Sequence, residues 1–195
     1  MTRKFLTALA ILIFMQFTSA VAQVCWRYEH DAACTSYPIT DFTLTTPFPG
    51  AAGLPERHVD FATNLGWLFE TNERVALGPA FFFSAYLNGG WHSQWGLHGR
   101  GRFYLTEKWQ LQISPGVIVR DSPYPDGFAG YSVAVDVMHK DWVGFTARLD
   151  VVKSYPEGHD TVFLFGLKAG SYIGMGMSGA GAVVGGIAYI VSQID

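Results

Sequence analysis

The chain has 195 residues, of which 49% are hydrophobic and only 15% are charged, and its net charge at pH 7 is -3. This composition excludes a disordered chain, and the length suits a single folded domain. No cluster of lysine and arginine follows one face of a predicted helix, so nucleic acid is not an expected partner.

Residues 1–22 have the three parts of a secretory signal peptide. Arg3 and Lys4 form its positive start, residues 5–17 form an apolar core, and Ala20 and Ala22 belong to a small-residue cleavage site. An uncleaved membrane anchor fits less well, because an apolar core of about 13 residues is shorter than the roughly 20 that span a bilayer. We therefore expect an exported protein.

Two cysteines lie close together in an N-terminal arm, residues 23–38, which has no clear period. Export places Cys25 and Cys34 in an oxidising compartment, where one disulfide between them is the simplest expectation. Two free thiols are the alternative. Neither cysteine has the histidine arrangement of a nucleophile or of a zinc site.

Residues 92–106 alternate between two kinds of side chain with a period of two. Because side chains alternate faces along a β-strand, one face of this strand suits hydrocarbon and the other requires water or counter-charges. The apolar positions are odd, namely Trp95, Leu97, Phe103 and Leu105. The polar positions are even, namely His92, Gln94, His98, Arg100 and Arg102.

The same alternation recurs along the chain, and from residue 58 to residue 169 the odd face is the apolar one in every segment. A soluble sandwich also alternates, but its outward faces are usually richer in lysine, glutamate and threonine than the even face of this chain. A barrel with lipid outside and a polar lumen fits better. The segments are a weak one at 39–46, then 58–70, 74–87, 92–106, 109–120, 128–139, 142–153 and 163–169.

The links between these segments alternate in length, as do the short periplasmic turns and longer external loops of outer-membrane barrels. The tight links are 71–73, 106–108 and 139–141, and the longer ones are 47–57, 88–91, 121–127 and 154–160. In pattern and topology, residues 39–171 resemble the small eight-stranded outer-membrane β-barrel proteins of Gram-negative bacteria. The resemblance implies an all-β, antiparallel up-and-down transmembrane barrel of about eight strands, with outer-membrane lipids as its partners.

Aromatic residues gather near the predicted strand ends, as in the interfacial girdles of membrane barrels. Those near the tight links are Trp67, Phe69, Phe103 and Trp109, and those nearer the longer links are Trp91, Trp95 and Tyr124.

The C-terminal segment, residues 172–195, departs from the usual aromatic-terminated closing strand. It is apolar and rich in glycine and alanine, with small residues at Gly170, Gly174, Ser178, Ala182 and Gly186. Small residues spaced by four let a helix pack closely against another surface, including a second copy of itself. We expect a helix here, with one or two glycine-rich strands as the alternative.

Register through the tight links predicts which polar residues meet in the lumen. It places Glu70 opposite Arg74 and Arg102 opposite Gln112. Pairing through the longer link 121–127 then brings Asp136 opposite Gln112, so these residues share one layer in which Asp136 is the expected acid partner of Arg102. A second layer holds His98, Ser132 and Arg148, while Arg100 faces only Ala80 and Ser114. The expected polar network of the lumen comprises Glu70, Arg74, His98, Arg100, Arg102, Gln112, Asp136, Arg148 and Asp150.

The expected function is that of a structural, adhesion-type or narrowly permeable outer-membrane barrel, without cofactor or metal. His92 and His98 are about 20 Å apart along a strand, too far to share a metal. The GxGxxG match at 174–179 lacks a βαβ unit and is attributed to chance. The alternatives are a barrel that binds lipid or solute, including a lipid-modifying enzyme, and a soluble exported sandwich or lipid-binding barrel.

Overall fold

The structure is a computed structural model that describes residues 35–48, 59–87, 91–121, 129–153, 158–170, 173–177 and 179. The predicted signal peptide, the predicted disulfide between Cys25 and Cys34, and most of the C-terminal segment lie outside the described residues.

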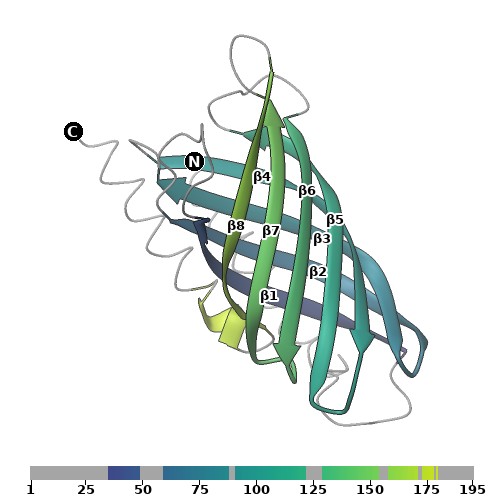
Figure 1. The fold of residues 1–195 in the computed structure, drawn as a ribbon. Coiled ribbons are helices and arrows are strands. Elements are labelled where there is room, and N and C mark those ends of the chain that lie inside the picture. The colour runs from purple at the N-terminus through teal and green to yellow at the C-terminus, as the bar shows by residue number, and fades with distance from the viewer. Residues whose placement is uncertain are drawn as a thin grey trace, which may run out of the picture.

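Eight antiparallel strands form one closed barrel, in which each strand pairs with the next and β8 pairs with β1 (Figure 1). This confirms the predicted all-β, up-and-down architecture. The weakly predicted first strand is present and is longer than expected. The strands are β1 (Ser36–Pro47), β2 (Asp60–Asn72), β3 (Val75–Leu87), β4 (Trp91–Tyr104), β5 (Trp109–Asp121), β6 (Gly130–His139), β7 (Val143–Lys153) and β8 (His159–Ala169).

The register around the barrel determines its tilt and width. A path of paired residues that leaves β1 at Ser36 passes through Phe69, Leu77, Gly101, Ile113, Val135, Ala147 and Phe165 and returns to β1 at Thr46. The path therefore advances by ten residues for eight strands. With a rise of about 3.3 Å per residue and a strand spacing of about 4.7 Å, this stagger gives a tilt of about 41° and a backbone radius of about 8 Å.

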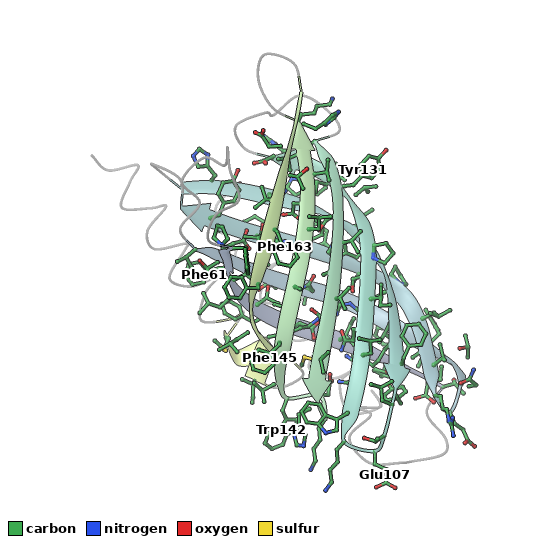
Figure 2. All side chains as sticks on the ribbon, viewed as in Figure 1. Phe61, Glu107, Tyr131, Trp142, Phe145 and Phe163 are labelled. Carbon is green, nitrogen blue, oxygen red and sulfur yellow. The ribbon has the colours of Figure 1, made fainter. Side chains whose placement is uncertain are left out.

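The tight turns lie at the end of the barrel where β1 begins and β8 finishes. The β4–β5 turn is closed by Thr106, whose hydroxyl oxygen accepts hydrogen bonds from the backbone N–H groups of Lys108 at 3.2 Å and Trp109 at 3.0 Å. The β6–β7 turn contains Lys140 in the left-handed region, with φ of 53°. Exposed charged residues of these turns, such as Glu107, mark this end of the molecule (Figure 2).

The barrel is polar inside and apolar outside. The guanidinium of Arg102, the ammonium of Lys168 and the amide of Gln112 belong to side chains less than 2% exposed. Phe145 is 71% exposed and points away from the barrel wall (Figure 2). Other large apolar residues with exposed side chains on the strands include Leu65, Trp67, Phe69, Leu77, Phe81, Phe83, Leu97, Trp109, Ile113, Tyr131, Val133, Val135, Val137, Leu149, Phe163, Phe165 and Leu167.

A β-bulge in β5 reverses the expected facing of its last residues. Trp95 pairs with Arg120 whereas Gly96 pairs with Ile118, so Val119 is an extra residue. After the bulge, Arg120 is exposed and Asp121 is buried. Arg120 has an even number, so the alternation of the segment 109–120 predicts that it lies on the inner face. That prediction was wrong, because one inserted residue moves each later side chain to the opposite face.

Candidate functional site in the barrel lumen

Asp41 of β1 is the centre of the first group of lumen charges, and it is fully buried. Its Oδ2 accepts from a guanidinium N–H of Arg100 and lies 3.0 Å from the ammonium of Lys168. The same ammonium lies 2.6 Å from the Asp136 carboxylate and donates to the side-chain oxygen of Gln112 at 3.2 Å. Side chains from β1, β4, β5, β6 and β8 thus meet at one place inside the barrel.

Arg148 of β7 is the centre of the second group. Its Nη2 lies 2.8 Å from Asp60 of β2 and 3.1 Å from Asp150, its neighbour on β7. The hydroxyl of Ser132 donates to the other oxygen of Asp150 at 2.7 Å. The ion pair between Arg148 of β7 and Asp60 of β2 therefore joins two strands that are not adjacent in the sheet.

A small cavity of about 20 Å³ lies between these groups, lined by Arg100, Arg148 and Lys168 among others. His98 lines it and stacks on Phe82 with ring centroids 4.3 Å apart. Neither ring nitrogen of His98 has a hydrogen-bond partner among the described residues. A polar cavity of this size has room for about one water molecule. A water molecule there would supply the hydrogen-bond partner that the buried ring nitrogens of His98 require.

A third group lies near the tight turns. Arg102 forms an ion pair of 2.9 Å with Asp141 of the β6–β7 turn, and its guanidinium lies 5.6 Å from the ring centroid of Tyr37. The hydroxyls of Tyr37 and Tyr104 are hydrogen-bonded to each other. These contacts direct the buried side chain of Arg102 toward the tight turns.

Two apolar clusters interrupt the polar lumen. One lies toward the tight turns, and the other lies close to the opposite ends of its strands. The first consists of Tyr37, Ile39, Leu68, Ala76 and Ala80, with Tyr104 packed against it. The second consists of Phe82, Ile118, Ala129 and Val152. These apolar side chains share the interior of the barrel with the buried ion pairs.

The expected layer of Arg102, Gln112 and Asp136 has the expected register, because Arg102 pairs with Gln112 and Gln112 with Asp136. The inferred ion pair between Arg102 and Asp136 was nevertheless wrong. Asp136 pairs with Lys168 of β8, and Arg102 pairs with Asp141. Register specifies backbone neighbours, whereas the tilt of the strands lets long side chains reach across the lumen or along its axis.

The second expected layer is only partly joined: Ser132 and Arg148 both contact Asp150, while His98 lies beside the cavity. Arg100 lies opposite Gly78 rather than Ala80, and Ser114 accepts a hydrogen bond of 3.2 Å from its Nε.

The predicted pair of Glu70 and Arg74 is not a lumen pair. Glu70 is half-buried and lies opposite Ala76, because Arg74 belongs to the turn and β3 begins only at Val75. Arg74 is exposed in the β2–β3 turn, where its backbone N–H donates to the Asn72 side chain at 2.8 Å. Of the predicted interface aromatics, the exposed ones are Trp67, Phe69 and Trp109, and the half-buried ones are Trp95 and Phe103.

Several lumen residues were missing from the predicted network, although the alternation places most of them on the polar face. Asp41 shares the inner face of β1 with Thr43 and Thr45, and Asp60 and Lys168 occupy even positions like the other inward residues. Asp121 had no such signal, because the bulge turns it inward, where its carboxylate accepts from the Tyr86 hydroxyl at 2.7 Å.

Among the described residues, no group of three or more histidine, cysteine, aspartate or glutamate side chains could hold a metal ion. In the same part of the chain, no helix has the length and hydrophobicity needed to cross a membrane. Comparison with known proteins finds no protein-family model that matches the chain and no curated protein similar to it in sequence.

Proposed function

We propose that this protein is an integral β-barrel of a Gram-negative outer membrane, with a lumen closed by ion pairs and a structural or adhesion-type role. The observation that carries the proposal is the inversion of the barrel. Charged side chains such as Asp41 and Arg102 are buried, while residues such as Phe145 and Leu97 are exposed on the outside. In water, an apolar surface that surrounds a whole domain would cause aggregation, whereas lipid is its natural solvent.

The dimensions of the barrel support a membrane location. Its strands contain between 10 and 14 residues, which at a tilt of about 41° corresponds to a height of roughly 25–35 Å. A bilayer has a hydrocarbon core of about 30 Å, and outer-membrane barrels carry an apolar band of about 25 Å. The exposed indoles of Trp109 and Trp142 lie near the charged turn residues, as interfacial anchors do.

The contents of the lumen argue against a channel and against a soluble lipid carrier. A lipid-binding barrel needs an apolar interior, but here Asp60, Asp136 and Arg148 are buried inside. A channel needs a continuous water-filled space, and an eight-stranded barrel is nearly filled by its own side chains. The cavity between the ion pairs is only about 20 Å³. These features best support a barrel whose lumen is closed by ion pairs and whose role is structural or adhesive.

Fractionation and gel migration test the proposal. The full-length protein, expressed in a Gram-negative host, is expected in the outer-membrane fraction, extractable only with detergent and shifted in apparent mass when heated before electrophoresis. A freely soluble, monomeric periplasmic product would overturn the membrane assignment. Planar-bilayer recordings test the closed lumen separately, since steady single-channel conductance from the purified protein would contradict it.

A further inference from the structure

The seam between β1 and β8 is the shortest in the barrel. It contains six residue pairs, from Phe42 with Ala169 to Pro47 with Leu164, whereas the next shortest, between β4 and β5, contains nine. Residues 36–41 of β1 continue beyond the end of β8. At Thr40, the edge that faces away from β2 has no pairing with any strand in the described part of the chain.

The open edge lies at the level of the apolar outer surface. Thr40 pairs on its other side with Leu65, whose side chain is 51% exposed, and Pro38 pairs with Trp67, which is 40% exposed. Backbone N–H and C=O groups that face hydrocarbon without partners are unfavourable by several kcal/mol each. In a membrane, this edge therefore needs a cover.

A helical turn at residues 173–177 lies beside this edge, just after the end of β8 (Figure 1, yellow). Its start is anchored by the backbone N–H of Gly170, which donates to the carbonyl of Trp142 at 2.9 Å, and by that of Gly174, which donates to the carbonyl of Gly170 at 3.1 Å. Gly174 packs so closely that a Cβ atom would lie 2.6 Å from the carbonyl oxygen of Ala169 at the end of β8 and 2.7 Å from that of Thr40 on β1.

Burial of Thr40 supports the contact. In β1 the outward positions are even, and Leu44 on that face is 40% exposed, yet Thr40 is only 8% exposed. The sides of the helical turn that do not face β1 are apolar and open, since Ile173, Met175 and Met177 are between 42% and 47% exposed. The turn thus has one side against the edge of β1 and another side suited to acyl chains.

We infer that residues 173–177 form a membrane-embedded clasp, which covers the open edge of β1 at Thr40 and exposes Ile173, Met175 and Met177 to lipid acyl chains. This inference rests on the proposed membrane function. It gives residues 173–177 part of the role that a closing strand has in other barrels, because they shield the β1 backbone at Thr40, which β8 is too short to pair.

Two glycines of the turn provide a matched test of the packing. Gly174→Val, in the full chain in detergent micelles, is expected to lower the midpoint of thermal unfolding by about 5 °C, because its side chain meets backbone atoms that have no room to move. Gly176→Val is the control, since a Cβ atom there meets nothing within 4 Å. If Gly174→Val does not fold, the smaller change Gly174→Ala replaces it in the same comparison of thermal midpoints. Equal midpoints for the variants at 174 and 176 would overturn the clasp.

Spin labels in proteoliposomes test the contact with lipid. A label on Met175→Cys is expected to be accessible to oxygen and protected from a water-soluble nickel chelate, as is a label on Leu65→Cys at the barrel surface. If only the label at 175 is accessible to the chelate, the clasp is not embedded. If both labels are accessible to it, the membrane assignment itself fails.

Discussion

Removal of the Asp41 carboxylate is expected to be among the most destabilising single changes in the lumen. Its Oδ2 contacts both Arg100 and Lys168 at a position with no exposure to solvent. In Asp41→Ala, Lys168 retains Asp136, but the described contacts leave Arg100 with only the Ser114 hydroxyl. Breaking a buried pair by removing one partner costs roughly 3–5 kcal/mol, because the other charge stays buried without compensation.

For a chain of this size, such a loss lowers the midpoint of thermal unfolding by about 10 °C. Urea unfolding in lipid vesicles, followed by the fraction of heat-modifiable protein on gels, measures the free energy directly. Leu44→Ala is the control on the same strand, since Leu44 lies on the outer face and its loss leaves no buried charge. Asp41→Asn separates charge from volume and is expected to lie close to Asp41→Ala.

A double-mutant cycle identifies the cause of the loss. The double variant Asp41→Leu with Arg100→Leu is expected to lose about 2 kcal/mol less unfolding free energy than the sum of the losses in the two single variants. The reason is that each single variant leaves one buried charge unpaired, whereas the double variant removes both charges. Additive losses would refute the reasoning, and so would an Asp41→Ala variant that unfolds at the same urea concentration as the parent protein.

Three further changes test other parts of the structure. Val135→Arg, on the outer face, is expected to cost about 2–4 kcal/mol and to prevent refolding into vesicles, measured as the heat-modifiable fraction; normal refolding would contradict the assigned facing. Asp141→Asn leaves the buried guanidinium of Arg102 facing a neutral amide that still accepts a hydrogen bond, so it is expected to cost about 2 kcal/mol in urea unfolding, and a loss as large as that of Asp41→Ala would contradict this. Lys140→Gly relieves a left-handed backbone and is expected to raise the thermal midpoint by about 2 °C, whereas a fall would contradict the assigned turn.

The alternation of side chains was sufficient to predict the closed barrel and the facing of most strands. It worked because a period of two assigns every residue of a strand to one of two faces, so Leu97 and Arg100 are separated without knowledge of the partners. It failed at Arg120 and Asp121, where one bulged residue reverses the faces. Nothing in the local composition around Val119 indicates that insertion.

The ion pairs were harder to predict than the strands. Backbone register through the turns correctly placed Arg102 beside Gln112, but the partner of Asp136 comes from β8, which is not its neighbour in the sheet. Which long side chains meet across a lumen depends on the stagger of the whole barrel, and this stagger is known only when β1 and β8 are paired. The link across the lumen between Asp41 and Arg100 depends on the same closure.

The cross-lumen pairs also give a physical reason for a single register. Hydrogen bonds of the sheet join only adjacent strands, whereas Asp41 with Arg100 joins β1 to β4, and Asp60 with Arg148 joins β2 to β7. A slip of one residue in any strand would turn its inward charges toward lipid, at a cost of about 2–4 kcal/mol for each arginine or lysine near the bilayer centre. The buried charges, which contribute little net stability as pairs, therefore destabilise a barrel that is misaligned by one residue more strongly than they stabilise the correct one.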